Sequence, residues 1–93
     1  MNETDRNPYF IDTVGTISVL HSRIVSIRWE APAAVAGNAV VIENAQAKVL
    51  WQSKATGPNY VEAEHWEYNA PLVADGIVVP TLDAGSLWIQ LKP

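Results

Sequence analysis

Apolar residues along this chain occur in short runs that alternate with polar positions at the spacing of β-strands rather than helices. Between Val14 and Leu91 these runs are rich in β-branched and aromatic residues. Residues that favour turns interrupt them about every ten positions, a pattern typical of β-sandwiches and small barrels. The expected strands cover residues 9–12, 14–20, 22–30, 38–43, 48–54, 60–68, 77–80 and 86–92.

The pattern predicts an all-β protein with a single small antiparallel β-sandwich, jelly-roll-like, of about seven to eight strands. A chain of 93 residues has room for one such domain. Residues 1–8 are polar and precede a short apolar anchor, so we expect an N-terminal arm (1–8) and a β-sandwich domain (9–93). We expect the arm to leave the domain and lie on an adjacent subunit, because extended segments pair with exposed strand edges.

Alternation within the strands predicts which side chains point into the core. The inward set is Val25, Ile27, Trp29, Leu87, Ile89 and Leu91. Trp88 then points outward, either toward a partner or toward a second stacked sheet. Trp29 and Trp51 are expected to fill the core. The candidate partner-contact residues are Tyr9, Phe10, Trp66, Tyr68 and Trp88.

The composition is unusually apolar for so small a domain. Hydrophobic residues make up 48% of the chain and charged residues only 17%, against a typical value of about 25%. A small domain cannot bury that much apolar surface, so part of it is expected to face partners. The composition therefore favours a homo-oligomer or an array on a larger surface.

The net charge of −4 falls in the C-terminal part of the chain. Residues 58–93 carry Lys92 against five carboxylates, and no cluster of Lys and Arg occurs anywhere. This argues against nucleic acid and against an anionic membrane surface as partners. The start is polar and no apolar run reaches membrane-spanning length, so we expect synthesis as a soluble product in the cytoplasm.

Candidate chemistry is sparse. Glu62 and Glu64 have a spacing reminiscent of glycosidase carboxylates, but such pairs normally come from separate strands, so a solvated acidic face is favoured. His65 and Glu67 share one strand face but offer only two metal ligands. The chain has no cysteine and no G-x-S-x-G or phosphate-loop motif. We therefore predict that the protein is not an enzyme, with no catalytic, cofactor or metal residues.

The four tryptophans raise a different class of function, sugar binding, because sugar rings stack on exposed aromatic side chains. Trp66 beside Glu62 and Glu64, or Trp88 beside Gln90, would form such a platform. The alternative interpretation is that the tryptophans fill the core and interfaces. A small carbohydrate-binding β module thus stays open as an alternative function.

Several stretches resemble a group of small structural proteins of tailed bacteriophages. These stretches are residues 27–29, 36–42, 48–53, 57–62 and 76–89, and the likeness extends over roughly residues 14–92. The loop Asn44-Ala45-Gln46-Ala47 departs from the pattern, which has Gly before Lys48. The matching motifs are turns and core strands, which specify a fold more closely than a role.

The resemblance implies a β-sandwich component of the virion, made in the host cytoplasm. The first expectation is a capsid decoration or cement protein that binds the major capsid protein across subunit boundaries. The second is a tail, neck or fibre-base component that binds another virion protein. Both expectations agree with an excess of apolar residues and with a role that needs no catalysis.

Overall fold

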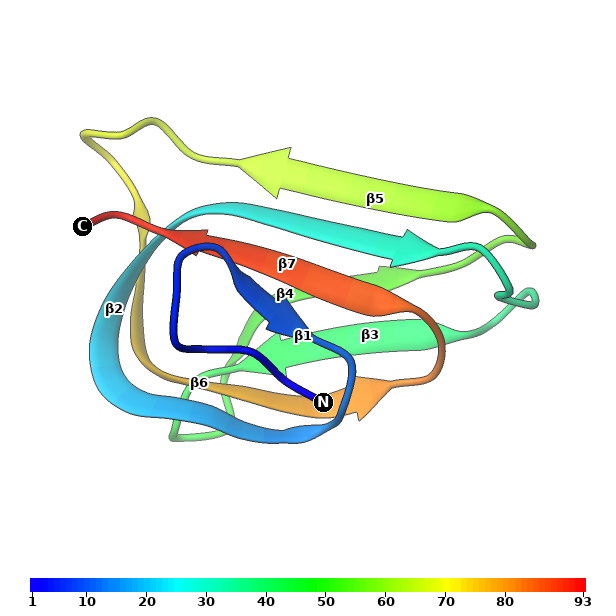
Figure 1. The fold of residues 1–93 in the computed structure, drawn as a ribbon, viewed down its shortest axis with the longest axis horizontal. Coiled ribbons are helices and arrows are strands. Elements are labelled where there is room, and N and C mark those ends of the chain that lie inside the picture. Colours follow the sequence, from blue (N-terminus) through cyan, green and yellow to red (C-terminus); the bar gives the residue numbers. More distant parts are fainter.

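The computed structural model describes residues 1–93 as seven antiparallel strands with no helix. The strands are β1 (Tyr9–Ile11), β2 (Gly15–Ala31), β3 (Ala39–Glu43), β4 (Val49–Lys54), β5 (Tyr60–His65), β6 (Leu72–Leu82) and β7 (Ser86–Leu91). They form one sheet in the order β1-β7-β2-β6-β3-β4, and β5 pairs with β2. The sheet is not closed, and the predicted all-β antiparallel class is confirmed (Figure 1). No segment forms a helix with the length and apolarity needed to cross a bilayer.

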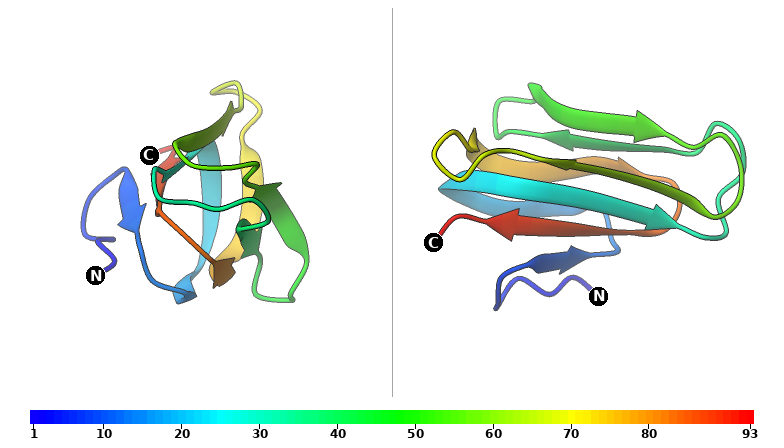
Figure 2. Two further views of the ribbon diagram at one scale, coloured as in Figure 1. Left: turned by 90° about the vertical axis from the view of Figure 1, so that its right-hand side faces the viewer. Right: turned by 90° about the horizontal axis from the view of Figure 1, so that it is seen from above.

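The long strand β2 organises the sheet. Its first half, from Gly15 to Ile24, pairs with β6, whereas its second half pairs with β7 on one edge and with β5 on the other. The register shifts between Thr16 and His21 and again after Ile24. Such bulges bend a strand and increase its twist. As a result β2 and β6 curve together and the sheet wraps around its core (Figures 1 and 2).

Three predicted boundaries are wrong. The strands expected at 14–20 and 22–30 are one bent strand, because the irregularity near His21 is a bulge rather than a turn. The strand expected at 77–80 spans Leu72–Leu82, since Gly76 is buried within it and lies at φ 89° instead of ending a turn. The strand expected at 60–68 ends at His65, and the chain turns where the amide of Ala70 bonds to the carbonyl of Glu67.

The core lies inside the curled sheet and contains 15 buried apolar residues. Trp29 is fully buried and donates its indole N–H to the Ala84 carbonyl at 2.8 Å, and Trp51 is also buried, as predicted. Ile27, Trp29, Leu87 and Ile89 point inward as expected. Val25 and Leu91 are only half-buried. Val25 is not fully buried because the register of β2 with β7 shifts after Ile24, and Ile24 is buried instead.

Residues 1–8 fold back on their own domain, which differs from the expected arm on a neighbouring subunit. Glu3 and Phe10 exchange two backbone hydrogen bonds, of 2.7 and 2.9 Å, along the edge of β1. The side chain of Asn7 bonds both the amide and the carbonyl of Leu91, at 2.9 and 2.6 Å. Hydrogen bonds to backbone groups at the edge of the sheet thus hold this segment against its own domain.

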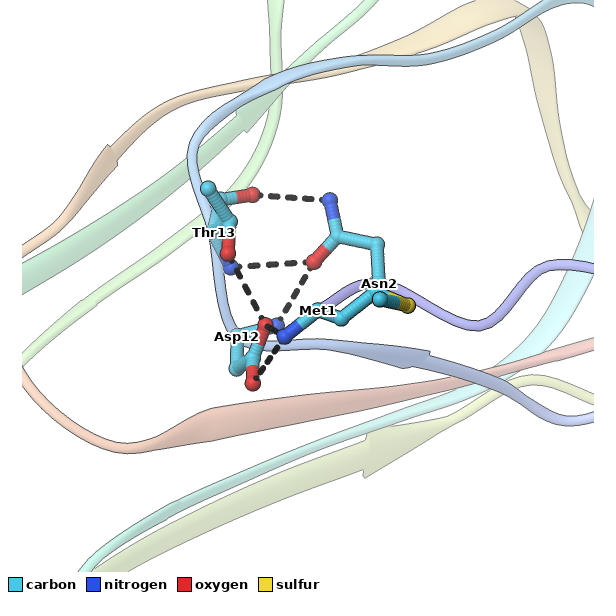
Figure 3. Close-up of polar contacts among 4 residues, drawn as sticks. All are labelled: Met1, Asn2, Asp12 and Thr13. Carbon is cyan, nitrogen blue, oxygen red and sulfur yellow. Dashed lines mark hydrogen bonds and ion pairs between the residues drawn. The ribbon is translucent and has the colours of Figure 1, made fainter.

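The first two residues close this segment onto the turn after β1 (Figure 3). The Met1 amino group donates to both carboxylate oxygens of Asp12 at 2.7 Å. Asn2 Oδ1 accepts the amide N–H groups of Asp12 and Thr13 at 2.8 and 2.9 Å, and Asn2 Nδ2 donates to the Thr13 carbonyl. The hydrogen bond from the amino group, followed by that from the Thr13 hydroxyl, lowers the pKa of Asp12 below its ordinary value.

Candidate interaction surfaces

A row of side chains crosses four strands on the outer face of the sheet. The registers place Phe10 opposite Trp88, Trp88 opposite Arg28, and Arg28 opposite Ala63. The rings of Phe10 and Trp88 are 4.7 Å apart at a tilt of 59°. Trp88 remains 37% exposed, which confirms its predicted outward position. This row, which we call the aromatic row, presents two aromatic rings beside a cation.

The folded-back N-terminal segment makes a shallow hollow next to the aromatic row. Its volume is about 360 Å³, and it is lined by Glu3, Arg6, Pro8, Phe10 and Trp88. Aromatic surface, a carboxylate and a guanidinium therefore meet in one place. Such a combination offers both stacking and charged hydrogen bonds to a bound group.

The strand β5 is unusual because residues 61–65 are exposed on both of its faces. It pairs only with β2, and it lies at the top of the molecule in Figure 1 with no strand beyond it. Glu62 and Glu64 are in register with the buried residues Trp29 and Ile27 and therefore lie on the inner face. Ala63 lies on the outer face, opposite Arg28. His65 and Glu67 were expected to share one strand face, but the strand ends at His65, so Glu67 lies outside it.

The two carboxylates of β5, Glu62 and Glu64, differ in their contacts. Glu64 Oε1 accepts the indole N–H of Trp51 at 3.0 Å, which joins β5 to β4 although the two strands share no backbone pairing. Glu62 makes no such contact and stays exposed. His65 and Glu67 gain no third ligand, and no group of three His, Asp or Glu side chains is arranged to hold a metal ion.

The five predicted contact residues do not form one surface. Phe10 and Trp88 adjoin in the aromatic row. Tyr9 and Trp66 are half-buried and pack against the core. Tyr9 belongs to β1 and is in register with the buried Ile89, whereas Trp66 directly follows β5. Tyr68 is 57% exposed at a separate position, where the Lys92 ammonium lies 4.6 Å from the centre of its ring.

One exposed apolar site was not predicted from the sequence. Val19 and Leu20 lie in the bulged part of β2 and are 77% and 70% exposed. Two adjacent apolar residues in a regular strand would point to opposite faces, so only one of them would be exposed. The bulge removes that alternation, and only the irregular run Ser18–His21 in the sequence hints at it.

Comparison of the chain with protein-family models, with curated proteins and with solved structures gave no match.

Proposed function

We propose that this protein is a structural component of a tailed-bacteriophage virion, a decoration or cement protein that binds the major capsid protein. The virion role is what the sequence resemblance over residues 14–92 implies, and the structural observation that supports a partner-binding role is the excess of apolar surface. Hydrophobic residues make up 48% of the chain, but only 15 of them form the buried core. The large hydrophobic side chains left exposed are Met1, Val14, Val19, Leu20, Val35, Val49, Val61, Tyr68, Val73 and Trp88.

The distribution of this surface supports a role inside an assembly. Exposed apolar side chains come from β2, β4, β5, β6 and β7, so they do not gather on one binding face. A protein that sits across subunit boundaries meets several neighbours at once and needs apolar contacts on several sides. The same distribution is compatible with a tail, neck or fibre-base position, which is the second choice within the same virion.

The test is the amount of this protein in purified virions, measured by quantitative mass spectrometry against the major capsid protein. We expect a copy number comparable with that of the capsid subunits. A copy number that matches a single ring at the neck or tail would replace the first choice with the second. If purified virions contain none of the protein, the virion assignment is wrong.

We also propose that the curled sheet is organised as a jelly-roll-like sandwich. Support comes from β2, whose two halves pair with different strands. One layer would contain β1, β7, the second half of β2, and β5. The other would contain the first half of β2, β6, β3 and β4. A crystal structure would test it, and strands that close into a continuous barrel would contradict it.

A carbohydrate-binding module is the second candidate function, favoured by the hollow beside the aromatic row. Trp88 offers a partly exposed ring there, next to the charged groups of Glu3 and Arg6. Sugar binding needs this pairing of an aromatic platform with polar hydrogen-bonding groups. A glycan array probed with the wild type and with Trp88→Ala tests it, because binding that survives the substitution, or no binding at all, rejects the site.

A further inference from the structure

The outer edge of β5 is a main-chain surface that the fold leaves unpaired. Just beyond this strand, the amide of Trp66 donates to the Val25 carbonyl of β2 at 2.8 Å. Backbone groups alternate in direction along an antiparallel strand, so those of Glu62 and Glu64 also face β2. The N–H and C=O groups of Val61, Ala63 and His65 then face away from the sheet. They make no backbone hydrogen bond to any other segment.

The other side of the molecule shows what a covered edge looks like. At β1, Glu3 exchanges two backbone hydrogen bonds with Phe10 and so occupies the edge that β7 does not use. Proteins commonly protect exposed strand edges in this way, because unpaired edges recruit other strands. No segment of this chain does the same for β5, although both of its faces are also exposed.

The side chains of β5 restrict which strand can pair with it. Its inner face carries the carboxylates of Glu62 and Glu64, and its outer face carries the small apolar side chains of Val61 and Ala63. A second copy of β5 would bring glutamates opposite glutamates in antiparallel pairing, and like charges in that position are destabilising. The chain has no Lys or Arg between Lys54 and Lys92, and Arg28 of the neighbouring strand β2 lies opposite Ala63 on the outer face, away from these two carboxylates.

We propose that this edge binds an extended segment of a partner protein in which Lys or Arg alternates with small apolar residues. The segment would add a strand to the sheet through main-chain hydrogen bonds with Val61, Ala63 and His65. Its cations would lie beside Glu62 and Glu64, and its apolar side chains beside Val61 and Ala63. The inference rests on the proposed function, in which the segment belongs to the major capsid protein, and it names the chemistry of that segment.

A peptide titration followed by NMR tests the edge without the virion. The probe is a short peptide in which lysine and valine alternate. The controls are a peptide of the same composition with its lysines and valines in two blocks, and a peptide in which glutamate replaces lysine. We expect only the alternating lysine peptide to shift the amide signals of Val61, Ala63 and His65 and to protect them from hydrogen exchange. Equal effects from the block peptide would mean charge attraction without strand addition and would overturn the proposal.

Two variants separate the main-chain and charge contributions. Ala63→Pro removes an N–H that faces solvent, which an edge strand tolerates, and it should abolish peptide binding. The double variant Glu62→Gln with Glu64→Gln keeps the side-chain shapes and an oxygen acceptor for Trp51. It should bind about tenfold more weakly, since two cross-strand ion pairs are lost. Unchanged binding by the double variant would overturn the proposed chemistry of the segment.

Self-association is the remaining outcome to distinguish. If the same three amides become protected as the protein concentration rises without peptide, the occupant is a second copy and the proposal is wrong. Failure of the peptide experiment leaves the virion assignment to be judged by copy number. Absence of the protein from virions removes the capsid as the source of the segment but leaves the edge chemistry measurable.

Discussion

The indole N–H of Trp51 donates a 3.0 Å hydrogen bond to Oε1 of Glu64, and this bond connects two strands that share no backbone pairing. Trp51 belongs to β4, at one end of the strand order, and Glu64 belongs to β5, whose only partner is β2. Trp51 is buried, whereas Glu64 is exposed. A side-chain contact therefore spans the place where the curled sheet remains open.

Replacing Glu64 tests how much this hydrogen bond contributes to the free energy of unfolding. Glu64→Ala should lower the free energy of unfolding by about 1–3 kcal/mol, because it leaves the Trp51 N–H without its acceptor. Glu64→Gln should cost less, since its amide oxygen can still accept the bond. Glu62→Ala is the matched control, because Glu62 is exposed and has no such partner, so its effect should stay within about 0.5 kcal/mol. Urea unfolding of the three variants measures the difference, and equal stabilities of Glu64→Ala and Glu62→Ala would contradict the bridging role.

The turn between β6 and β7 depends on a glycine at residue 85. Gly85 lies at φ 77°, and a Cβ there would overlap the Glu30 carbonyl oxygen and lie 2.7 Å from the Ala31 Cα. Gly85→Ala should therefore destabilise the domain by at least about 2 kcal/mol, through strain and steric conflict with β2.

Gly57→Ala is the control for this turn, because nothing lies within 4 Å of a Cβ at residue 57. Its effect on stability should stay within about 0.5 kcal/mol. Thermal melts of the two variants give the comparison, and similar melting temperatures would show that β2 moves aside at no cost.

The sequence predicted much of this fold because the core strands are regular. Alternation placed Leu87 and Ile89 inside and Trp88 outside, and the structure agrees. Prediction failed where the backbone departs from regular pairing. The bulges in β2 merge two expected strands and expose both Val19 and Leu20, and a bulge changes alternation without any special residue type.

The candidate surfaces were predictable only in part. Phe10 and Trp88 were singled out as aromatic residues, but their contact depends on the pairing of β1 with β7, which no local pattern reveals. The hollow beside them needs residues 1–8 to fold back, and this depends on individual hydrogen bonds from Asn2 and Asn7. The open edge of β5 likewise follows from strand order, which is a property of the whole chain.

The contact between Met1 and Asp12 should make the N-terminal segment sensitive to acid. The pKa of Asp12 is lowered from 3.8 in the folded protein, chiefly by the hydrogen bond from the Met1 amino group. Protonation is thus easier in the unfolded chain, so the stabilisation is fully present above the ordinary pKa and is lost as the pH falls through the lowered value. We expect the difference in melting temperature between the wild type and Asp12→Asn to shrink as the pH decreases below about 4.

The control for this pH dependence is chemical acetylation of the amino group, which removes its charge and leaves Asp12 in place. The acetylated protein should lose most of the acid-dependent increment that Asp12→Asn removes, because the hydrogen bond from the Thr13 hydroxyl still lowers the pKa of Asp12. A difference in melting temperature that stays constant across the acid range would show that the ion pair in Figure 3 does not form in solution.

Two tryptophans separate stability from attachment. Trp29 is fully buried, so Trp29→Ala should cost about 3–5 kcal/mol through cavity formation, and the variant should be recovered mainly as misfolded protein. Trp88 lies on the outer face and packs on Phe10, so Trp88→Ala should cost only about 1 kcal/mol.

Under the proposed function, the same change should strongly reduce binding to the particle, since exposed tryptophans dominate interface energies. Val35→Ala, at another exposed apolar position outside the strands, is the control for general loss of apolar surface. Co-sedimentation with capsids that lack the protein, together with thermal melts, gives both readings. Trp88→Ala that binds like Val35→Ala would exclude the aromatic row as the contact surface.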